Sequence, residues 1–204
     1  GLQSWAVSHH GLPVMIVLEG AVALSPFRRE RLEARLQSIA ADLRIVGTWH
    51  VYFIDAAAPH ALHSTTLARV LDASDTVQPV AQGSVSRIVV PRLGTRSPWS
   101  SKATELVRGA GQAINRVERG MRIDLSGWPA DPAVAAALGK VLHDPMTQTL
   151  LDDAGQAGAL FSTPARKALE RIALDQLEAA NARLGLALAE DEIAYLRQRY
   201  GGLG

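Results

Sequence analysis

Cysteine is absent from the 204-residue sequence. Its absence excludes disulfides, thiolate metal sites, iron–sulfur clusters and a thiol nucleophile. Aromatic residues make up only 5% of the chain, which leaves little material for a base-stacking surface. The 21 basic and 20 acidic side chains nearly cancel, so the clustered basic excess of nucleic-acid-binding proteins is missing. We therefore expect a cytoplasmic protein whose partners do not include nucleic acid.

The sequence also has no apolar run near the roughly 20 residues that a membrane span needs, so no membrane partner is expected. What it does have is 48% hydrophobic and 20% charged residues, the ordinary balance of a globular protein. Residues 1–14 include His9 and His10 but have neither the basic end nor the apolar run of a signal peptide. We interpret this segment as a tag remnant or a misannotated start, with Met15 as the natural beginning.

Two parts of the sequence repeat the same pattern at a constant offset. The apolar run Ile16–Leu18 falls on Ile88–Val90, and Ser25-Pro26 falls on Ser97-Pro98. In each Ser-Pro pair the serine can cap a helix and the proline suits its first position. A second strand follows in each copy, with apolar residues on one parity: Ile45, Trp49, Val51 and Phe53, then Val117, Met121, Ile123 and Leu125. The repeat predicts a duplicated strand–helix–strand unit.

The fold class that follows is α+β. One copy alone has too few strands, so we expect both copies to form one four-stranded, mainly antiparallel sheet over residues 15–127, with helices on one face. The other face is expected to be solvated, which would favour a homodimer of the chain. Beyond Gly127 the strand pattern ends and helical spacing takes over, so residues 128–204 are predicted to be an all-helical linker.

Residue spacing does not indicate a catalytic, cofactor-binding or metal site. His60 and His63 lie three residues apart but lack a third ligand, which favours an ordinary helix start. Ser100 and Ser101 precede Lys102 by two residues and one, whereas a Ser–Lys nucleophile pair needs three.

The first helix begins with a basic turn. Arg28, Arg29 and Arg31 alternate with Glu30 and Glu33, which favours a solvated helix face with local ion pairs.

The turn before the helix that begins at Ser97-Pro98 allows two interpretations. The free N–H groups of the helix start, helped by Arg92, Arg96 and Lys102, can hold a small anion. The simpler interpretation is that Ser97 or Ser100 caps the helix and that the cations are solvated.

This turn also carries a family resemblance. Residues 92–104, RLGTRSPWSSKAT, and residues 115–120, NRVERG, closely resemble the N-terminal domain of large-type phosphoribosylformylglycinamidine synthase. Residues 184–196 resemble the linker before that enzyme's synthetase domain, and residues 18–20 and 23–27 match its opening strand and helix. Leu93 departs from the family, which commonly has proline there.

The resemblance implies a parent ligase of purine biosynthesis that converts FGAR to FGAM with Mg-ATP and glutamine. Its N-terminal domain is similar to a fused dimer of a small structural subunit, in agreement with the repeat in this sequence. The partners implied are the synthetase and glutaminase domains of the same chain, whose packing and coupling this region would support. No position here matches the family's catalytic segments, so we expect this chain alone to be inactive.

Within the resemblance, the candidate interface with the rest of the enzyme is Ser97, Trp99, Ser100 and Lys102. The alternative is a free-standing regulatory module with a ferredoxin-like sheet that binds a small anion at the Ser97 turn.

Overall fold

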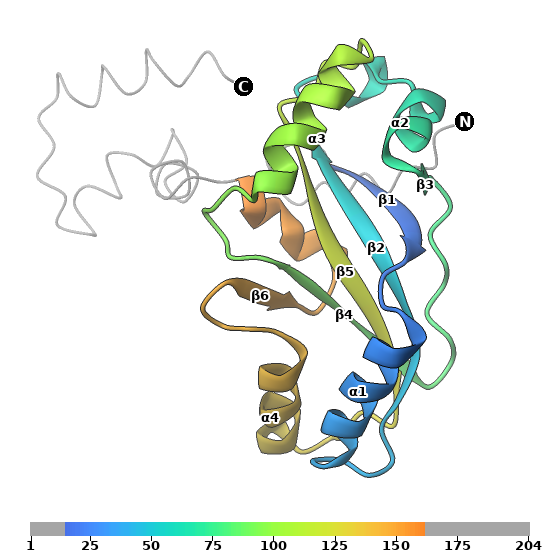
Figure 1. Cartoon of the computed structure of the whole chain (residues 1–204), viewed down its shortest axis with the longest axis vertical. Coiled ribbons are helices and arrows are strands. Elements are labelled where there is room, and N and C mark those ends of the chain that lie inside the picture. The colour runs from blue at the N-terminus through green and yellow to red at the C-terminus, as the bar shows by residue number, and fades with distance from the viewer. Residues whose placement is uncertain (1–14, 162–204) are drawn as a thin grey trace, which may run out of the picture. The chain divides into compact units, whose positions relative to one another are not determined.

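The computed structural model describes residues 15–161 (Figure 1). Residues 1–14 and the helices predicted beyond residue 161 lie outside the described residues. The elements are, in chain order, β1 Met15–Val22, α1 Pro26–Gln37, β2 Arg44–Asp55, the 3-10 helix η1 Pro59–Ala61, α2 Ser64–Leu71, β3 Ala73–Ser74, β4 Ser84–Pro91, α3 Pro98–Gly109, β5 Arg116–Ser126, α4 Pro132–Leu142, β6 Gln148–Leu151 and the 3-10 helix η2 Ala154–Phe161.

The fold is α+β, but the sheet of the described region has six strands rather than the four predicted. The order is β3-β1-β2-β5-β4-β6, and every neighbouring pair is antiparallel. The four predicted strands lie side by side in the middle, and β3 and β6 extend the two edges. Strand β6 falls in the region predicted to be all helical, so that prediction is wrong there. A four-residue segment of two polar residues and two leucines does not reveal its type by periodicity, and it becomes a strand here by pairing with the free edge of β4.

The repeat is clearest in the helices. Helices α1 and α3 have the same length, and their first residues, Pro26 and Pro98, correspond at the offset found in the sequence. The hydroxyl of Ser25 accepts a hydrogen bond from the Arg28 N–H at 3.3 Å, and the hydroxyl of Ser97 accepts one from the Ser100 N–H at 3.1 Å. Both serines are N-caps followed by a proline, as their sequence predicts.

The first strands of the two copies do not follow this offset. Strands β1 and β4 begin at Met15 and Ser84, because the loop before the helix has three residues in the first copy and six in the second. Gly94 takes a positive φ of 84° within the longer loop. The alignment of Ile16–Leu18 with Ile88–Val90 is therefore wrong by three residues. One apolar run resembles another, and only strand pairing reveals the different loop lengths.

A β-bulge in β2 makes the second strands of the two copies differ. The pairing of β2 with β5 changes register between Ile45 and Gly47, so residues before and after the bulge alternate in opposite phase. Ile45 packs in a cluster with Ile123, whereas Val51 and Phe53 pack in a different one. The prediction that Ile45 shares a face with Val51 and Phe53 is therefore wrong.

The four α-helices of the described region pack on one face of the sheet, as predicted, and we call it the helical face. Helices α2 and α3 cover one end of it and α1 and α4 the other, as Figure 1 shows. The residues that β1, β2, β4 and β5 contribute to this face include Ile16, Leu18, Ile45, Tyr52, Ile54, Val89, Val117, Met121, Ile123 and Leu125.

The opposite face of the sheet is not solvated, contrary to the prediction. Phe53 is fully buried there and Val90 is 1% exposed, and both pack in a cluster with Leu160 of η2. Charged residues are buried on this face as well: Arg122 donates to Asp124 at 2.8 and 2.7 Å and to Glu19 at 2.9 Å. The exposed face that favoured a homodimer is therefore not present in the described residues.

The close approach of β4 to β5 yields a stability test at Gly120. A Cβ atom there would lie 2.9 Å from the Val89 carbonyl oxygen and 3.0 Å from the Val90 side chain. We expect Gly120→Ala to lower the free energy of unfolding by about 1–3 kcal/mol because it overpacks the sheet. The matched control is Gly109→Ala in α3, where the new methyl meets nothing within 4 Å and should raise stability by about 0.5–1 kcal/mol. Urea denaturation of both variants is the measurement, and a neutral Gly120→Ala would contradict the close packing.

Candidate functional site

The turn before α3 is anchored by a buried carboxylate. The Ser97 hydroxyl donates to Glu118 Oε1 at 2.6 Å, and the Ser97 N–H donates to the other carboxylate oxygen at 3.4 Å. Glu118 is fully buried in β5, two residues from Arg116, whose guanidinium pairs with it at 2.5 Å. The chain's own carboxylate therefore takes the place of the small anion in one of the two interpretations, and the simpler interpretation of Ser97 as the helix cap is confirmed.

Arg116 ties three further segments to this turn. Its guanidinium donates to the carbonyl oxygens of Thr95 at 2.9 Å and Leu160 at 3.0 Å, and to the Ser100 hydroxyl at 3.1 Å. The Ser100 hydroxyl in turn donates to the Val117 carbonyl at 2.6 Å. The network fixes the start of α3 relative to β5 and η2. Sequence reasoning missed Arg116 and Glu118 as its centre, although both lie in the NRVERG motif.

The four predicted interface residues fall into two groups. Ser100 is fully buried and Ser97 is half-buried, and both hydroxyls serve the network. Lys102 is exposed and Trp99 is half-buried on α3, where a partner can reach them. The structure thus places Trp99 and Lys102 at the surface, whereas Ser97 and Ser100 hold the start of α3 in position.

Trp99 is held between two neighbours. Its ring stacks on Tyr52 with the centroids 5.7 Å apart, and the Arg119 guanidinium carbon lies 4.9 Å from its centroid. Beside it is a cavity of about 140 Å³ lined by Tyr52, Val70, Leu71, Trp99, Ala103 and Leu106. Leu106 is 67% exposed and adds apolar surface next to this cavity. We call Trp99, Lys102 and Leu106 the α3 patch.

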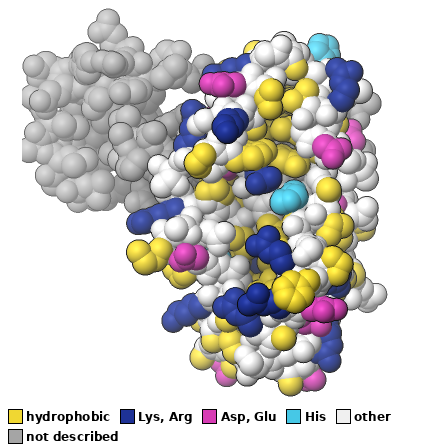
Figure 2. All heavy atoms as spheres, in the orientation of Figure 1, with side chains coloured by type: hydrophobic (Ala, Val, Ile, Leu, Met, Phe, Trp, Pro, Cys, Tyr) yellow, Lys and Arg dark blue, Asp and Glu magenta, His cyan; other side chains and the backbone are white. Residues whose placement is uncertain are grey.

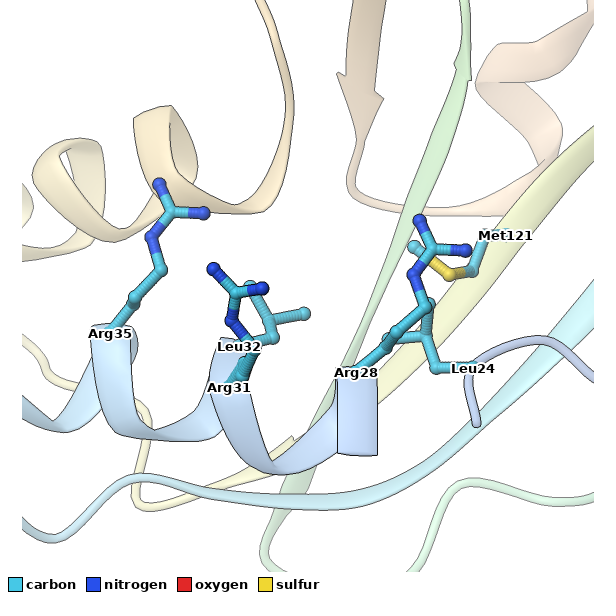
Figure 3. Close-up of a pocket in the computed structure, with 6 residues that line it drawn as sticks. All are labelled: Leu24, Arg28, Arg31, Leu32, Arg35 and Met121. Carbon is cyan, nitrogen blue, oxygen red and sulfur yellow. The ribbon is translucent and has the colours of Figure 1, made fainter. Parts of the chain in front are cut away.

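A second hollow lies beside α1. Its volume is about 230 Å³, and Figure 3 shows Arg28, Arg31 and Arg35 rising from one side of the helix. Leu24, Leu32 and Met121 complete the lining. In Figure 2 basic side chains gather over the part of the molecule where α1 lies in Figure 1.

The ion pairs predicted for this basic turn do not form. Glu33 accepts a hydrogen bond from the Ile45 N–H at 2.8 Å, so its carboxylate faces the sheet. Within residues 15–161 the four ion pairs are Arg87–Asp152, Arg116–Glu118, Arg122–Glu19 and Arg122–Asp124. Sequence reasoning also overlooked Arg35, which its spacing of four and seven residues from Arg31 and Arg28 could have revealed, because that spacing places all three on one side of a helix.

His50 lies between the two hollows. It pairs across the sheet with Met121, which lines the α1 hollow, and it is half-buried on the helical face. Burial lowers the pKa of its imidazole below the usual 6.5, and the positive charge of Arg119 lowers it further. Arg119 therefore lies close enough to His50 to act on it electrostatically.

The residues first considered as metal ligands are placed at a helix start. His60 lies in η1 and His63 is the N-cap residue of α2. No group of three or more potential ligands from histidine or carboxylate side chains occurs in the described part of the chain. A helix long and apolar enough to cross a membrane is likewise not found among those residues.

The buried ion pair of Arg116 and Glu118 predicts a large loss of stability when the charge of Glu118 is removed. We expect Glu118→Gln to reduce the free energy of unfolding by about 3 kcal/mol, because it leaves Arg116 poorly paired in a buried position. The control is Asp152→Asn, which removes a carboxylate that is 71% exposed and 3.4 Å from Arg87, and should cost under about 1 kcal/mol. Equal losses in urea denaturation of the two variants would contradict the assignment.

His50 predicts a pH dependence. Since its pKa is lower in the folded state than in the unfolded chain, its contribution to stability is present above about pH 6.5 and is lost as the pH falls through the folded value. NMR titration of the imidazole should give a midpoint below 6.5, and Arg119→Gln should move that midpoint upward. Arg69→Gln on α2 should leave it unchanged. A midpoint at or above 6.5 in the unsubstituted chain would show that the environment of His50 is misassigned.

Comparison with known families assigns the domain. Residues 49–161, more than half of the chain, match the formylglycinamide ribonucleotide amidotransferase N-terminal family. The matched region runs from β2 to η2 and includes the RLGTRSPWSSKAT turn and the NRVERG motif. The enzyme of this family is phosphoribosylformylglycinamidine synthase, of purine biosynthesis. The chain therefore belongs to the formylglycinamide ribonucleotide amidotransferase N-terminal family and represents the N-terminal domain of this enzyme.

Proposed function

We propose that this domain is a non-catalytic interface region that supports the packing and coupling of the synthetase and glutaminase domains. The observation that carries the proposal is the α3 patch, where an aromatic ring, an ammonium group and a leucine stand together at the surface. In this proposal the ATP, magnesium and glutamine that take part in the reaction are bound by the other domains, and the enzyme acts in the cytoplasm.

The rigidity of the α3 patch supports a docking role. Trp99 is stacked on Tyr52 and lies beside Arg119, while the Ser97 cap below it is bonded to the buried Glu118. A preorganised tryptophan loses little side-chain entropy on binding, and such residues dominate the energetics of many interfaces. Leu106, at 67% exposed, gives the partner further apolar area to cover.

The polar groups of the turn support a structural role rather than catalysis. Ser97 does donate to a carboxylate, which superficially suggests a nucleophile and its base. Glu118, however, is neutralised by Arg116 and also accepts from the Arg119 N–H at 3.1 Å. Both carboxylate oxygens are therefore engaged by donors of the fold itself, as expected for a structural carboxylate.

The test uses the complete enzyme and separates coupling from synthesis. In Trp99→Ala/Leu106→Ala we expect glutamine-dependent FGAM formation to fall by about tenfold or more, equivalent to losing one interface anchor. Synthesis from added ammonia should change by less than about twofold, because this reaction bypasses the transfer of ammonia between domains.

Two controls define the result. Trp99→Phe keeps an aromatic ring against Tyr52 and should retain most of the coupling. Met146→Ala removes another exposed apolar side chain, 77% exposed, from the loop between α4 and β6 and should have no effect. Unchanged glutamine-dependent activity in the double variant, or an equal fall in both activities, would refute the coupling role.

A further inference from the structure

We infer that the hollow beside α1 is a binding site for an organic polyphosphate such as a nucleoside triphosphate. The cavity of about 230 Å³ has a rim of three arginines and an apolar floor (Figure 3). It lies next to α1 rather than α3, so the inference does not depend on the proposed coupling function.

The spacing of the arginines suits a chain of phosphates. Arg28, Arg31 and Arg35 lie three and then four residues apart, which places them on one side of α1. At 1.5 Å of rise per residue the row extends over about 10 Å. Each guanidinium presents a planar fork of donors that matches phosphate oxygens in bidentate fashion.

These three arginines have no protein partner that accounts for them. Among the described residues, none of them takes part in an ion pair or donates a side-chain hydrogen bond to the protein. Arg31 has one contact, with its guanidinium carbon 5.7 Å from the centre of the Phe27 ring. Arg29, one residue away from Arg28, instead donates to the carbonyl oxygen of Ile45 at 2.5 Å. The adjacent arginine is thus used by the fold, while the three that line the hollow are left available.

The second copy of the repeat carries no arginine at the positions that match these three. The corresponding positions of α3, aligned through the two Ser-Pro caps, are Ser100, Ala103 and Val107, which are 0%, 6% and 0% exposed. Helix α1 packs on the sheet through Leu32 and Leu36, one residue after Arg31 and Arg35, so the three arginines are not part of that contact and carry exposed charge around a cavity. Three cations at one site repel one another, and a polyanion relieves that repulsion.

The floor of the hollow fits the organic part of the ligand. Leu24, Leu32 and Met121 provide apolar surface from the loop, from α1 and from β5. His50 pairs with Met121 across the sheet and Arg119 lies near His50, so a further cation stands beyond the arginine row. The small volume suits part of a nucleotide better than a peptide segment, which needs a longer groove.

The binding test uses ATP without magnesium and the 204-residue chain. Titration calorimetry should show saturable binding at one site per chain. Substitution of two arginines, Arg31→Gln/Arg35→Gln, should weaken it at least about tenfold, while Arg69→Gln on α2 removes the same kind of charge elsewhere and should change it less than about twofold. Glutamine retains helix propensity, and unchanged circular dichroism will show that α1 is intact.

The three methionines report where ATP binds. The methyl NMR signal of Met121 should shift on adding ATP, because Met121 lines the hollow. The signals of Met15, 4% exposed in β1, and Met146, 77% exposed in the loop between α4 and β6, should not shift. A shift of Met121 that disappears in the double arginine variant supports the site.

Several results would overturn the inference. These are no saturation at millimolar ATP, equal losses in Arg69→Gln and the double variant, or an unmoved Met121 signal. Tripolyphosphate that binds as tightly as ATP would show that the apolar floor plays no part. A polyglutamate peptide that binds more tightly than ATP would indicate a docking surface for an acidic protein instead.

Discussion

The antiparallel pairing of β2 with β5 is the interaction on which the rest of the domain depends. It joins the two copies of the repeat along their longest strands, and the pair His50–Met121 lies at its centre. The bulge adds one residue to β2, so the offset between the two copies is one residue shorter after it. His50 then corresponds to Met121, which is also its pairing partner, and the two copies are related by an approximate twofold rotation about this pair. One consequence is that α1 and α3 lie on the same face at opposite ends of the ladder. The surface between them is where His50, Arg119 and Met121 are found.

Charged side chains are buried and paired on one face of the sheet and exposed on the other. On the opposite face Arg122, Glu19 and Asp124 are at most 5% exposed, and burial there raises the pKa of Glu19. Such ions are tolerated only because each has a partner: Arg122 serves both carboxylates and also donates to the Gln78 carbonyl at 2.6 Å. This last bond ties the segment between β3 and β4 to the sheet. On the helical face, by contrast, the arginines that line the α1 hollow remain at the surface without carboxylate partners among the described residues.

The parts of the fold that were predictable from the sequence are those set by neighbouring residues. Ser25 and Ser97 act within three residues of their partners, so both helix starts and the offset between them could be found. The bulge after Ile45 could not be predicted. An extra residue in a strand leaves the alternation of side chains intact on either side of it and changes only which face of the sheet they point to. Strand β6 depends on the free edge of β4, which the local sequence does not reveal. At the site, the turn was recognised from its motif, but the roles of Arg116 and Glu118 depend on contacts that only the fold creates.

The duplication explains why two different surfaces arise on one scaffold. A fused repeat needs each copy to supply strands to the common sheet, but it does not need both helices to have the same outer or inner side chains. In α3 the sheet-facing positions are small or apolar, and the helix packs closely on the sheet. Trp99 and Leu106 are then available to a partner. In α1 the positions that match through the caps are arginines at the surface, and the helix packs on the sheet through Leu32 and Leu36, one residue further along. Since exposed arginines on a helix contribute little to folding, selection on the fold alone would not require three of them around one cavity. The arginine row around the α1 hollow is therefore the reason to look for a ligand at α1, and the α3 patch is the reason to look for a protein partner at α3.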